Sequence, residues 1–193
     1  MSSVRREDFV PQNVRDYAYR DEPLPIGEEQ TISAPHMVAI MCDLLSVEPQ
    51  SHVLEIGTGS GYHAAVLAEL AAKRTIYTVE RSARLAEQAR KRLPANVVVV
   101  TGDGSLGLPE KAPFDRILVT CSAPDLPPPL LAQLKGGGRM VIPLGKGIQE
   151  LYLVRKNGEI TKEPHGSVAF VLLIGKYGFS KEQSYERADY VRF

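Results

Sequence analysis

Short apolar runs alternate with amphipathic stretches through the middle of the chain. The apolar runs cover residues 52–57, 75–80, 96–101, 114–121 and 139–144. Apolar residues at helical spacing between them predict helices over 62–72, 82–93 and 127–134, the last of them ended by Gly136-Gly137-Gly138. The run 96–101 is too apolar for us to expect exposure of either face. Strands of this kind that alternate with helices indicate a parallel sheet covered on both sides.

The pattern changes after residue 145. A run at 150–155, the turn Lys156-Asn157-Gly158-Glu159 and a run at 168–174 follow with no helix between them. Asn-Gly between two apolar runs is a strong hairpin signal. We therefore predict an α/β fold with a doubly wound, mostly parallel, seven-stranded sheet and a C-terminal antiparallel hairpin.

The first 50 residues predict helical additions in front of the sheet. Residues 1–30 are polar and interrupted by prolines, which suggests an arm with one helical turn. Ser33 is expected to be the N-cap of a helix in which Pro35 occupies the first turn and which ends before Pro49. We expect one domain, divided into an N-terminal segment (1–50), a core (51–178) and an extension of unassigned role (179–193).

Composition narrows the range of partners. The chain has 23 basic and 23 acidic residues, so it lacks the basic surplus usual in proteins that bind nucleic acid. Cys42 and Cys121 form no CxxC pair, which fits a reducing compartment and predicts neither a disulfide nor a metal site. No signal-like apolar run opens the chain, and no stretch approaches the roughly 20 apolar residues of a membrane span. We expect a cytoplasmic monomer.

The strongest motif is Glu55-Ile56-Gly57-Thr58-Gly59-Ser60-Gly61, between a predicted strand and a predicted helix. Glycines there permit a tight turn and a close approach of a ligand to the backbone. A dinucleotide site would have glycine in the place of Tyr62, and the GK[ST] ending of a phosphate-binding loop is missing. The spacing resembles the first motif of S-adenosylmethionine methyltransferases. The alternative is a plain turn without a ligand.

Two carboxylates follow the next two predicted strands. Glu80 comes about 20 residues after the glycine loop, where a carboxylate can accept hydrogen bonds from both ribose hydroxyls. Its alternative role is to cap the helix that starts at Ser82. Asp103, between Gly102 and Gly104, can accept from an adenine amino group, or belong to an ordinary turn. Three such loops at one sheet edge favour a cofactor site.

From about residue 14 to residue 178 the chain resembles the protein-L-isoaspartate (D-aspartate) O-methyltransferases. The most specific segment is 30–37 (QTISAPHM), supported by 53–62 (VLEIGTGSGY), 114–117 (FDRI) and 170–179 (FVLLIGKYGF). The chain departs from the family pattern at Glu29, where a small residue is usual, at Ser122, where alanine is usual, and at Leu172, where proline is usual. None of these departures removes a group that the chemistry requires.

The resemblance implies a Rossmann-like class I methyltransferase that repairs proteins. It would transfer a methyl group from S-adenosylmethionine to the free α-carboxylate of L-isoaspartyl residues, with D-aspartyl residues as further candidates. Ser33 would be the active-site serine, and His36 is not expected to be a base. The expected cofactor-binding residues are Thr31, Ser33, Glu55, Gly57, Thr58, Gly59, Glu80, Arg81, Asp103 and Gly104.

Other functions remain open at this point. One is a methyltransferase of the same fold that acts on a small molecule or an RNA base; segment 30–37 and the neutral charge argue against it. Another is a non-catalytic regulator that binds the cofactor, against which the retained Ser33, Glu80 and Asp103 argue. Tyr62 disfavours a nicotinamide dehydrogenase. We also expect the segment 27–33 to close over the site and exclude water.

Overall fold

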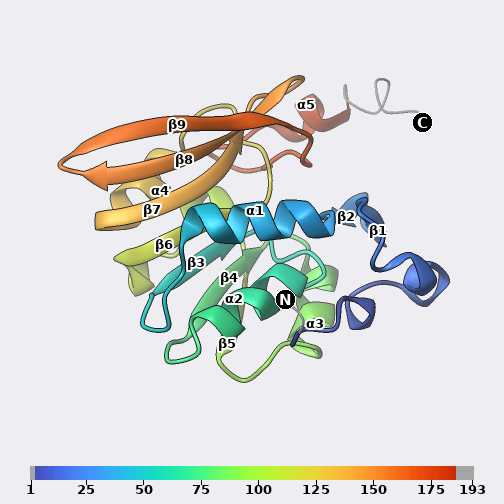
Figure 1. Cartoon of the computed structure of the whole chain (residues 1–193). Helices are drawn as coiled ribbons and strands as arrows, with labels where there is room; N and C mark the ends of the chain where they lie inside the picture. The colour runs from blue at the N-terminus through green and yellow to red at the C-terminus, as the bar shows by residue number, and fades with distance from the viewer. Residues whose placement is uncertain (1–2, 186–193) are drawn as a thin grey trace.

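Five parallel strands end at one edge of a seven-stranded sheet in the computed structural model, which describes residues 3–185 (Figure 1). The order is β5-β4-β3-β6-β7-β8-β9, and β8 and β9 pair antiparallel. The strands are β3 (Val53–Ile56), β4 (Ile76–Glu80), β5 (Val97–Thr101), β6 (Phe114–Val119), β7 (Leu134–Leu144), β8 (Gln149–Asn157) and β9 (Glu159–Val168). The predicted fold class is confirmed.

Helices cover both faces of this sheet. On one face, α1 (Pro35–Leu45) and α2 (Tyr62–Leu70) bury Met41, Leu45 and Leu67 against the strands, and α3 (Ala83–Arg90) lies beside them. On the other face, α4 (Pro128–Gln133) buries Leu130 in a second cluster with strand residues. Short 3-10 turns η3 (Gly104–Leu106) and η4 (Pro109–Lys111) connect β5 to β6. Packing in these two apolar clusters holds the strands in place, so that the ends of the parallel strands lie along one edge of the sheet.

The N-terminal segment is more structured than the sequence indicates. It contains two 3-10 turns, η1 (Arg6–Asp8) and η2 (Gln12–Tyr17), and a hairpin of β1 (Leu24–Gly27) and β2 (Gln30–Ile32). Figure 1 shows β1 and β2 beside the N-terminal end of α1. The prediction that Ser33 caps α1 is wrong: the cap position is Ala34, because Pro35 takes the first helical position. Ser33 is therefore free for another role.

Two expectations about strands are corrected. The tract Gly136-Gly137-Gly138 lies inside β7 rather than ending α4, and the β6–β7 register shifts between Phe114 and Arg116 where this tract begins. Glycine permits such an irregularity because it readily adopts positive φ values, such as the 81° of Gly137. β5 is also not buried on both faces. It is an edge strand, and Val98 is 41% exposed.

The C-terminal hairpin is present, but its second strand lies earlier than predicted. β9 spans Glu159–Val168 and is exposed along nearly its whole length, so it carries no apolar pattern. The apolar run 168–174 instead makes isolated β-bridges, such as the one between Ser122 and Leu172. Helix α5 (Lys181–Tyr185) follows, and the rest of the predicted extension, 186–193, lies outside the described residues. No helix among the residues described is long and apolar enough to cross a membrane.

Candidate active site

The glycine loop joins β3 to α2 at the edge where the parallel strands end. Gly57, Gly59 and Gly61 have φ values of 94°, 53° and 88°, a region that other residues rarely adopt. At Gly57 an added Cβ would lie 2.4 Å from Oγ1 of Thr120. The loop therefore needs glycine both for its backbone conformation and for its close approach to the end of β6.

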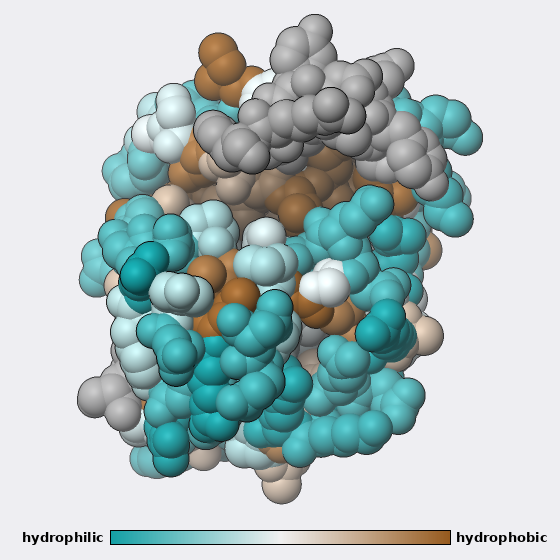
Figure 2. All heavy atoms as spheres, turned by 90° about the vertical axis from the view of Figure 1, so that its right-hand side faces the viewer, coloured by the Kyte–Doolittle hydropathy of each residue, from teal (hydrophilic) through white to brown (hydrophobic). Residues whose placement is uncertain are grey.

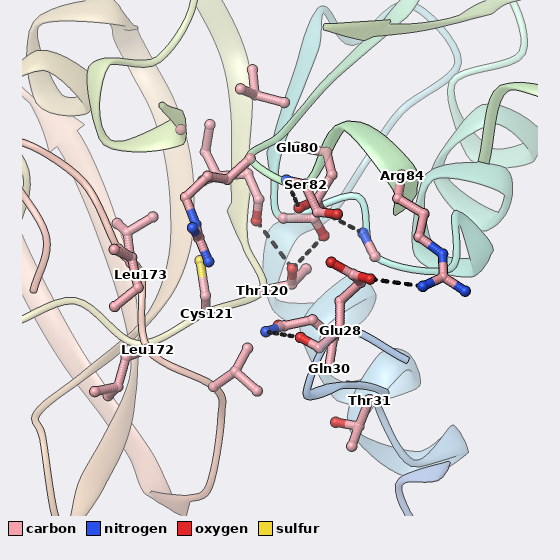
Figure 3. Close-up of a pocket in the computed structure, with 18 of the residues that line it drawn as sticks. Glu28, Gln30, Thr31, Glu80, Ser82, Arg84, Thr120, Cys121, Leu172 and Leu173 are labelled. Carbon is pink, nitrogen blue, oxygen red and sulfur yellow. Dashed lines mark hydrogen bonds and ion pairs between the residues drawn. The ribbon is translucent and has the colours of Figure 1, made fainter. Parts of the chain in front are cut away.

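A cavity of about 410 Å³ opens in front of this loop (Figure 3). Its walls come from the ends of β3, β4 and β6, the β1–β2 hairpin and the segment 171–174. It is lined by Glu28, Gln30, Thr31, Ile56, Gly57, Gly59, Val79, Glu80, Arg81, Ser82, Ala83, Arg84, Gly104, Thr120, Cys121, Val171, Leu172, Leu173 and Ile174. Figure 2, which looks onto this edge, shows a hollow with apolar surface among hydrophilic side chains. A nucleoside-sized ligand with an apolar base suits such a lining.

Glu80 links two of the loops around the cavity. Its Oε2 accepts a hydrogen bond from the backbone nitrogen of Gly59 across 2.9 Å, and its Oε1 accepts from that of Ser82 across 2.8 Å. The N-cap of α3 is Ser82 itself, whose Oγ accepts from the nitrogen of Leu85. Each carboxylate oxygen has a further lone pair, so Glu80 can still accept hydrogen bonds from hydroxyls of a ligand.

The third predicted loop reaches the cavity through Gly104 rather than Asp103. A Cβ at Gly104 would lie 2.5 Å from Cγ2 of Ile56, so the loop packs closely on β3. The Asp103 carboxylate does not line the cavity. It accepts from the nitrogen and hydroxyl of Ser105 at 2.9 and 2.7 Å and from the nitrogen of Lys176 at 2.8 Å. The adenine contact of Asp103 stays a prediction.

A second pocket of about 40 Å³ adjoins the first. Both are lined by Thr31, Gly57, Gly59 and Thr120, so the pockets share a wall. The smaller one also contains Ser33, which therefore lies beside the glycine loop, as predicted. Most of its polar lining residues carry a hydroxyl group, and His63 lines it as well; the former are Thr31, Ser33, Thr58, Ser60, Tyr62 and Thr120. Such a pocket offers several donors to an anionic group.

Glu55 does not reach either cavity. Its side chain is fully buried, and Oε2 lies 2.5 Å from Oγ1 of Thr78. Burial, reinforced by the nearby Glu80, raises the pKa of Glu55 to about 8, although the hydrogen bond from Thr78 opposes the shift. Direct cofactor binding by Glu55 stays a prediction, and its surroundings indicate a different role.

Neither histidine near the site has the features of a base. His36 is on the surface, with its Nδ1 2.7 Å from Asp21. His63 is buried, and burial lowers its pKa to about 3. Its Nε2 lies 3.3 Å from the thiol of Cys42, whose pKa burial raises to about 12. The imidazole in the small pocket is therefore neutral at physiological pH.

Several lining residues were missed by sequence reasoning. Thr120 follows β6, and its hydroxyl donates at 3.0 and 2.7 Å to the carbonyls of Ile56 and Gly57. Its position after a buried parallel strand was a usable signal. Glu28 and Gln30 belong to a hairpin that the sequence did not reveal. Arg81, by contrast, was predicted and lies on the exposed rim of the cavity. No group of three or more metal-binding side chains occurs in residues 3–185.

The chain matches a family of known proteins. The family profile of protein-L-isoaspartate(D-aspartate) O-methyltransferases matches residues 1–178. Protein-L-isoaspartate O-methyltransferase 1 of Archaeoglobus fulgidus is 56% identical over 184 residues, covering 93% of this chain and 85% of its own. The corresponding enzyme of Methanococcoides burtonii is 55% identical, covering 93% of this chain and 92% of its own.

Solved structures agree with these sequence matches. One protein-L-isoaspartate O-methyltransferase superposes with a TM-score of 0.83 at 32% identity; the match covers 90% of this chain and 59% of the longer one. A Plasmodium falciparum protein assigned to the same activity, solved with S-adenosyl-L-homocysteine, has a TM-score of 0.79 at 27% identity and covers 90% of this chain and 87% of its own.

Proposed function

The chain belongs to the protein-L-isoaspartate(D-aspartate) O-methyltransferase family, and on that premise we propose how its two pockets divide the reaction. The enzyme transfers a methyl group from S-adenosylmethionine to L-isoaspartyl residues of damaged proteins. In our proposal the larger cavity holds the cofactor and the smaller one receives the substrate carboxylate. The observation that carries this division is the wall that the two pockets share at Gly57, Gly59 and Thr120.

The residues of the larger cavity fit the cofactor. Glu80 offers acceptors for ribose hydroxyls, and Ile56, Val79 and Leu173 offer an apolar surface for the adenine. Gly57 and Gly59 line the cavity, so the backbone of the loop can approach the cofactor closely. When bound, S-adenosylmethionine supplies a methyl group on a sulfonium centre, an electrophile that needs no metal. Thr31 and Arg81 would complete the site at its rim.

The side chains of the smaller pocket have to bind and orient a carboxylate. The α-carboxylate of an isoaspartyl residue has a pKa near the reference range of about 3.3–3.7, so it is ionised at neutral pH and needs no general base. The hydroxyls of Ser33 and Thr58 can hold one oxygen in a fixed direction by donating hydrogen bonds. Orientation of this kind contributes on the order of 7–11 kcal/mol to lowering a barrier. Ser33 is the catalytic residue in this proposal.

Water has to be excluded during transfer, and the segment 27–33 is the proposed lid. Glu28 and Gln30 line the cavity from this segment, and Glu28 is paired with Arg84 on α3. Figure 3 shows Glu28 and Arg84 facing each other across the opening. The N-terminal segment 1–50 would thus contact the substrate, while the core 51–178 holds the cofactor. The extension 179–193 has no proposed role.

The substrate range and the setting of the enzyme are further parts of the proposal. D-Aspartyl residues are included as substrates, whereas nucleic acids, membranes and small molecules are not. A net charge of zero supports the exclusion of nucleic acid, and two free cysteines support a reducing, cytoplasmic setting. We also propose that the enzyme works as a monomer.

The test is transfer of a labelled methyl group to an isoaspartyl peptide and to its aspartyl twin. The expected product is labelled only in the isoaspartyl peptide, and mild base should release the label because it is held as an ester. Label that resists base, or equal labelling of both peptides, would contradict the proposed reaction. Cofactor binding by calorimetry without any transfer would support a regulator instead.

A further inference from the structure

A chain of hydrogen-bonding side chains leads from the buried core to the smaller pocket. Glu55 Oε2 lies 2.5 Å from Thr78 Oγ1, which lies 2.7 Å from Thr58 Oγ1. Glu55 and Thr78 are fully buried, whereas Thr58 lines the pocket beside Ser33. The three groups come from β3, β4 and the glycine loop, so the sheet register between β3 and β4 fixes their alignment. Glu55 can therefore act on the pocket without touching a ligand.

The surroundings of Glu55 favour its neutral form. Its other oxygen, Oε1, is buried and has no hydrogen-bond partner among the described residues. An unpaired carbonyl oxygen is much less costly to bury than an unpaired carboxylate oxygen. The nearby titratable groups are Glu80 at the end of β4, Cys42 on α1 and Cys121 after β6. Glu80 adds negative charge, and burial raises the pKa of both thiols, so none of them compensates an ionised Glu55.

We propose that protonated Glu55 is a positioning residue that turns the Thr58 hydroxyl proton toward the substrate carboxylate through Thr78. A protonated Glu55 donates to Thr78, Thr78 donates to Thr58, and the Thr58 proton then faces the pocket. When Glu55 loses its proton, Thr78 donates to it, Thr58 donates to Thr78, and only Thr58 lone pairs face the pocket. The same side chains thus attract a carboxylate in one state and repel it in the other.

This inference rests on the proposed function, because it assigns the carboxylate to the smaller pocket. Its consequence is a decrease of kcat/KM for the isoaspartyl peptide as pH rises through the ionisation of Glu55, which burial moves to about 8. The peptide carboxylate stays ionised throughout this range. The decrease should approach about tenfold per pH unit above that ionisation, because kcat/KM reports groups of the free enzyme.

The experiment compares pH profiles of the wild type with Glu55→Gln and Thr78→Val, and with Thr161→Val on exposed β9 as the matched control. Glu55→Gln has an amide that always donates, so its profile should be flat between pH 7 and 9. Thr78→Val breaks the chain of hydrogen bonds and leaves the volume of the side chain nearly unchanged. At pH 7 we expect kcat/KM of Thr78→Val to be about tenfold lower than that of the wild type, the effect of one hydrogen bond to a charged group. Thr78→Val should also lack the alkaline decrease. Thr161→Val should keep the wild-type profile.

Infrared spectroscopy of the protein without cofactor gives a second readout. The wild type should show the band of a buried protonated carboxyl at pH 7, which disappears in Glu55→Gln and shifts in Thr78→Val. Absence of that band, or an alkaline decrease that persists in Thr78→Val, would overturn the inference. If the wild type shows the band and Thr78→Val shifts it, but the wild type never methylates isoaspartyl peptide, the result would instead contradict the proposed function.

Discussion

Glu28 and Arg84 form an ion pair of 3.0 Å at the opening of the larger cavity. Glu28 belongs to the turn between β1 and β2, and Arg84 to the first turn of α3, so the pair connects the N-terminal hairpin to the cofactor-binding core. Glu28 and Glu29 have φ values of 53° and 56°, which are unfavourable for residues other than glycine. The strands of the hairpin are anchored by buried Leu24, Ile26 and Ile32, so opening and closing would be confined to this strained turn and its exposed ion pair.

Replacement of Arg84 by Ala should loosen this hairpin. Exposed ion pairs contribute about 0.2–1 kcal/mol, so we expect an increase in the Kd of the cofactor of at most about fivefold. Hydrogen exchange of residues 27–33 should be faster than in the wild type. Lys91→Ala at the C-terminal end of α3 removes a surface ion pair with Glu87 and is the control. The lid proposal fails if cofactor plus peptide leave the exchange of 27–33 unchanged in the wild type.

Glu80→Gln should weaken cofactor binding strongly. The amide keeps one acceptor but loses the charge to which Gly59 and Ser82 donate and which, in the proposed function, also binds the ribose hydroxyls. Loss of hydrogen bonds to a charged group costs about 1.5–3 kcal/mol, which corresponds to an increase in Kd of roughly 10- to 100-fold. Titration calorimetry measures this change, and Glu87→Gln on the exposed side of α3 is the control. Equal affinities for the two variants would exclude Glu80 from the cofactor site.

Gly57→Ala should destabilise the protein more than Gly158→Ala. Both glycines have positive φ, 94° and 83°, so both substitutions introduce backbone strain of about 1–3 kcal/mol. Only at Gly57 does the new Cβ clash, 2.4 Å from Oγ1 of Thr120, whereas nothing lies within 4 Å at Gly158. Urea unfolding of the two variants should therefore separate steric conflict from strain. A smaller loss for Gly57→Ala would indicate that the loop relaxes easily.

The buried part of the sheet was predictable, and its edges were not. β3, β4 and β6 are apolar because both of their faces are covered, so their sequences identify them. β9 is exposed on nearly every residue, so it has neither an apolar run nor an alternation to detect. The run 168–174 is apolar because its side chains are buried, with Phe170 and Leu173 packed into the apolar clusters. Its apolar composition therefore predicted a strand, although pairing in the sheet is not its cause.

The site was predictable where one loop contains the whole signal. The glycine loop and Glu80 were found because a ligand-binding turn has a local spacing. Thr120 was not found, and Glu28 was included only as part of the segment 27–33, because only the tertiary structure shows which side chains of the hairpin and of the end of β6 line the cavity. Glu55 belongs to the same motif as Gly57, but the sequence does not reveal that its side chain points into the core toward Thr78.

Ser33→Ala should reduce turnover and leave stability unchanged. Ala34, not Ser33, is at the cap of α1, so no helix-capping free energy is lost. Loss of one donor that orients the bound carboxylate corresponds to about a tenfold or larger decrease in kcat, with cofactor Kd within about twofold of the wild type. Thermal unfolding, calorimetry and single-turnover methyl transfer measure the three quantities. Equal effects on kcat and cofactor affinity would contradict a position on the substrate side.

Glu55 and His63 should make opposite contributions to stability as pH changes. Burial raises the pKa of Glu55 from 4.5 to about 8, so the folded state binds its proton more tightly than the unfolded state does. Its stabilising contribution is complete below about pH 4.5 and is lost between about pH 4.5 and 8. Burial lowers the pKa of His63 from 6.5 to about 3, so its contribution is complete above pH 6.5 and is lost as pH falls toward 3.

The two changes overlap and offset each other at about pH 4.5–6.5, so the wild type should be most stable there. Glu55→Gln removes the alkaline loss, so its free energy of unfolding should decrease less than that of the wild type between pH 5 and 8. His63→Gln should decrease less than the wild type between pH 6 and 4, because no buried imidazole has to become charged. Urea unfolding at each pH gives these slopes. If Glu55→Gln and the wild type have the same slope between pH 5 and 8, Glu55 is ionised in the folded protein, and its protonation cannot orient Thr58.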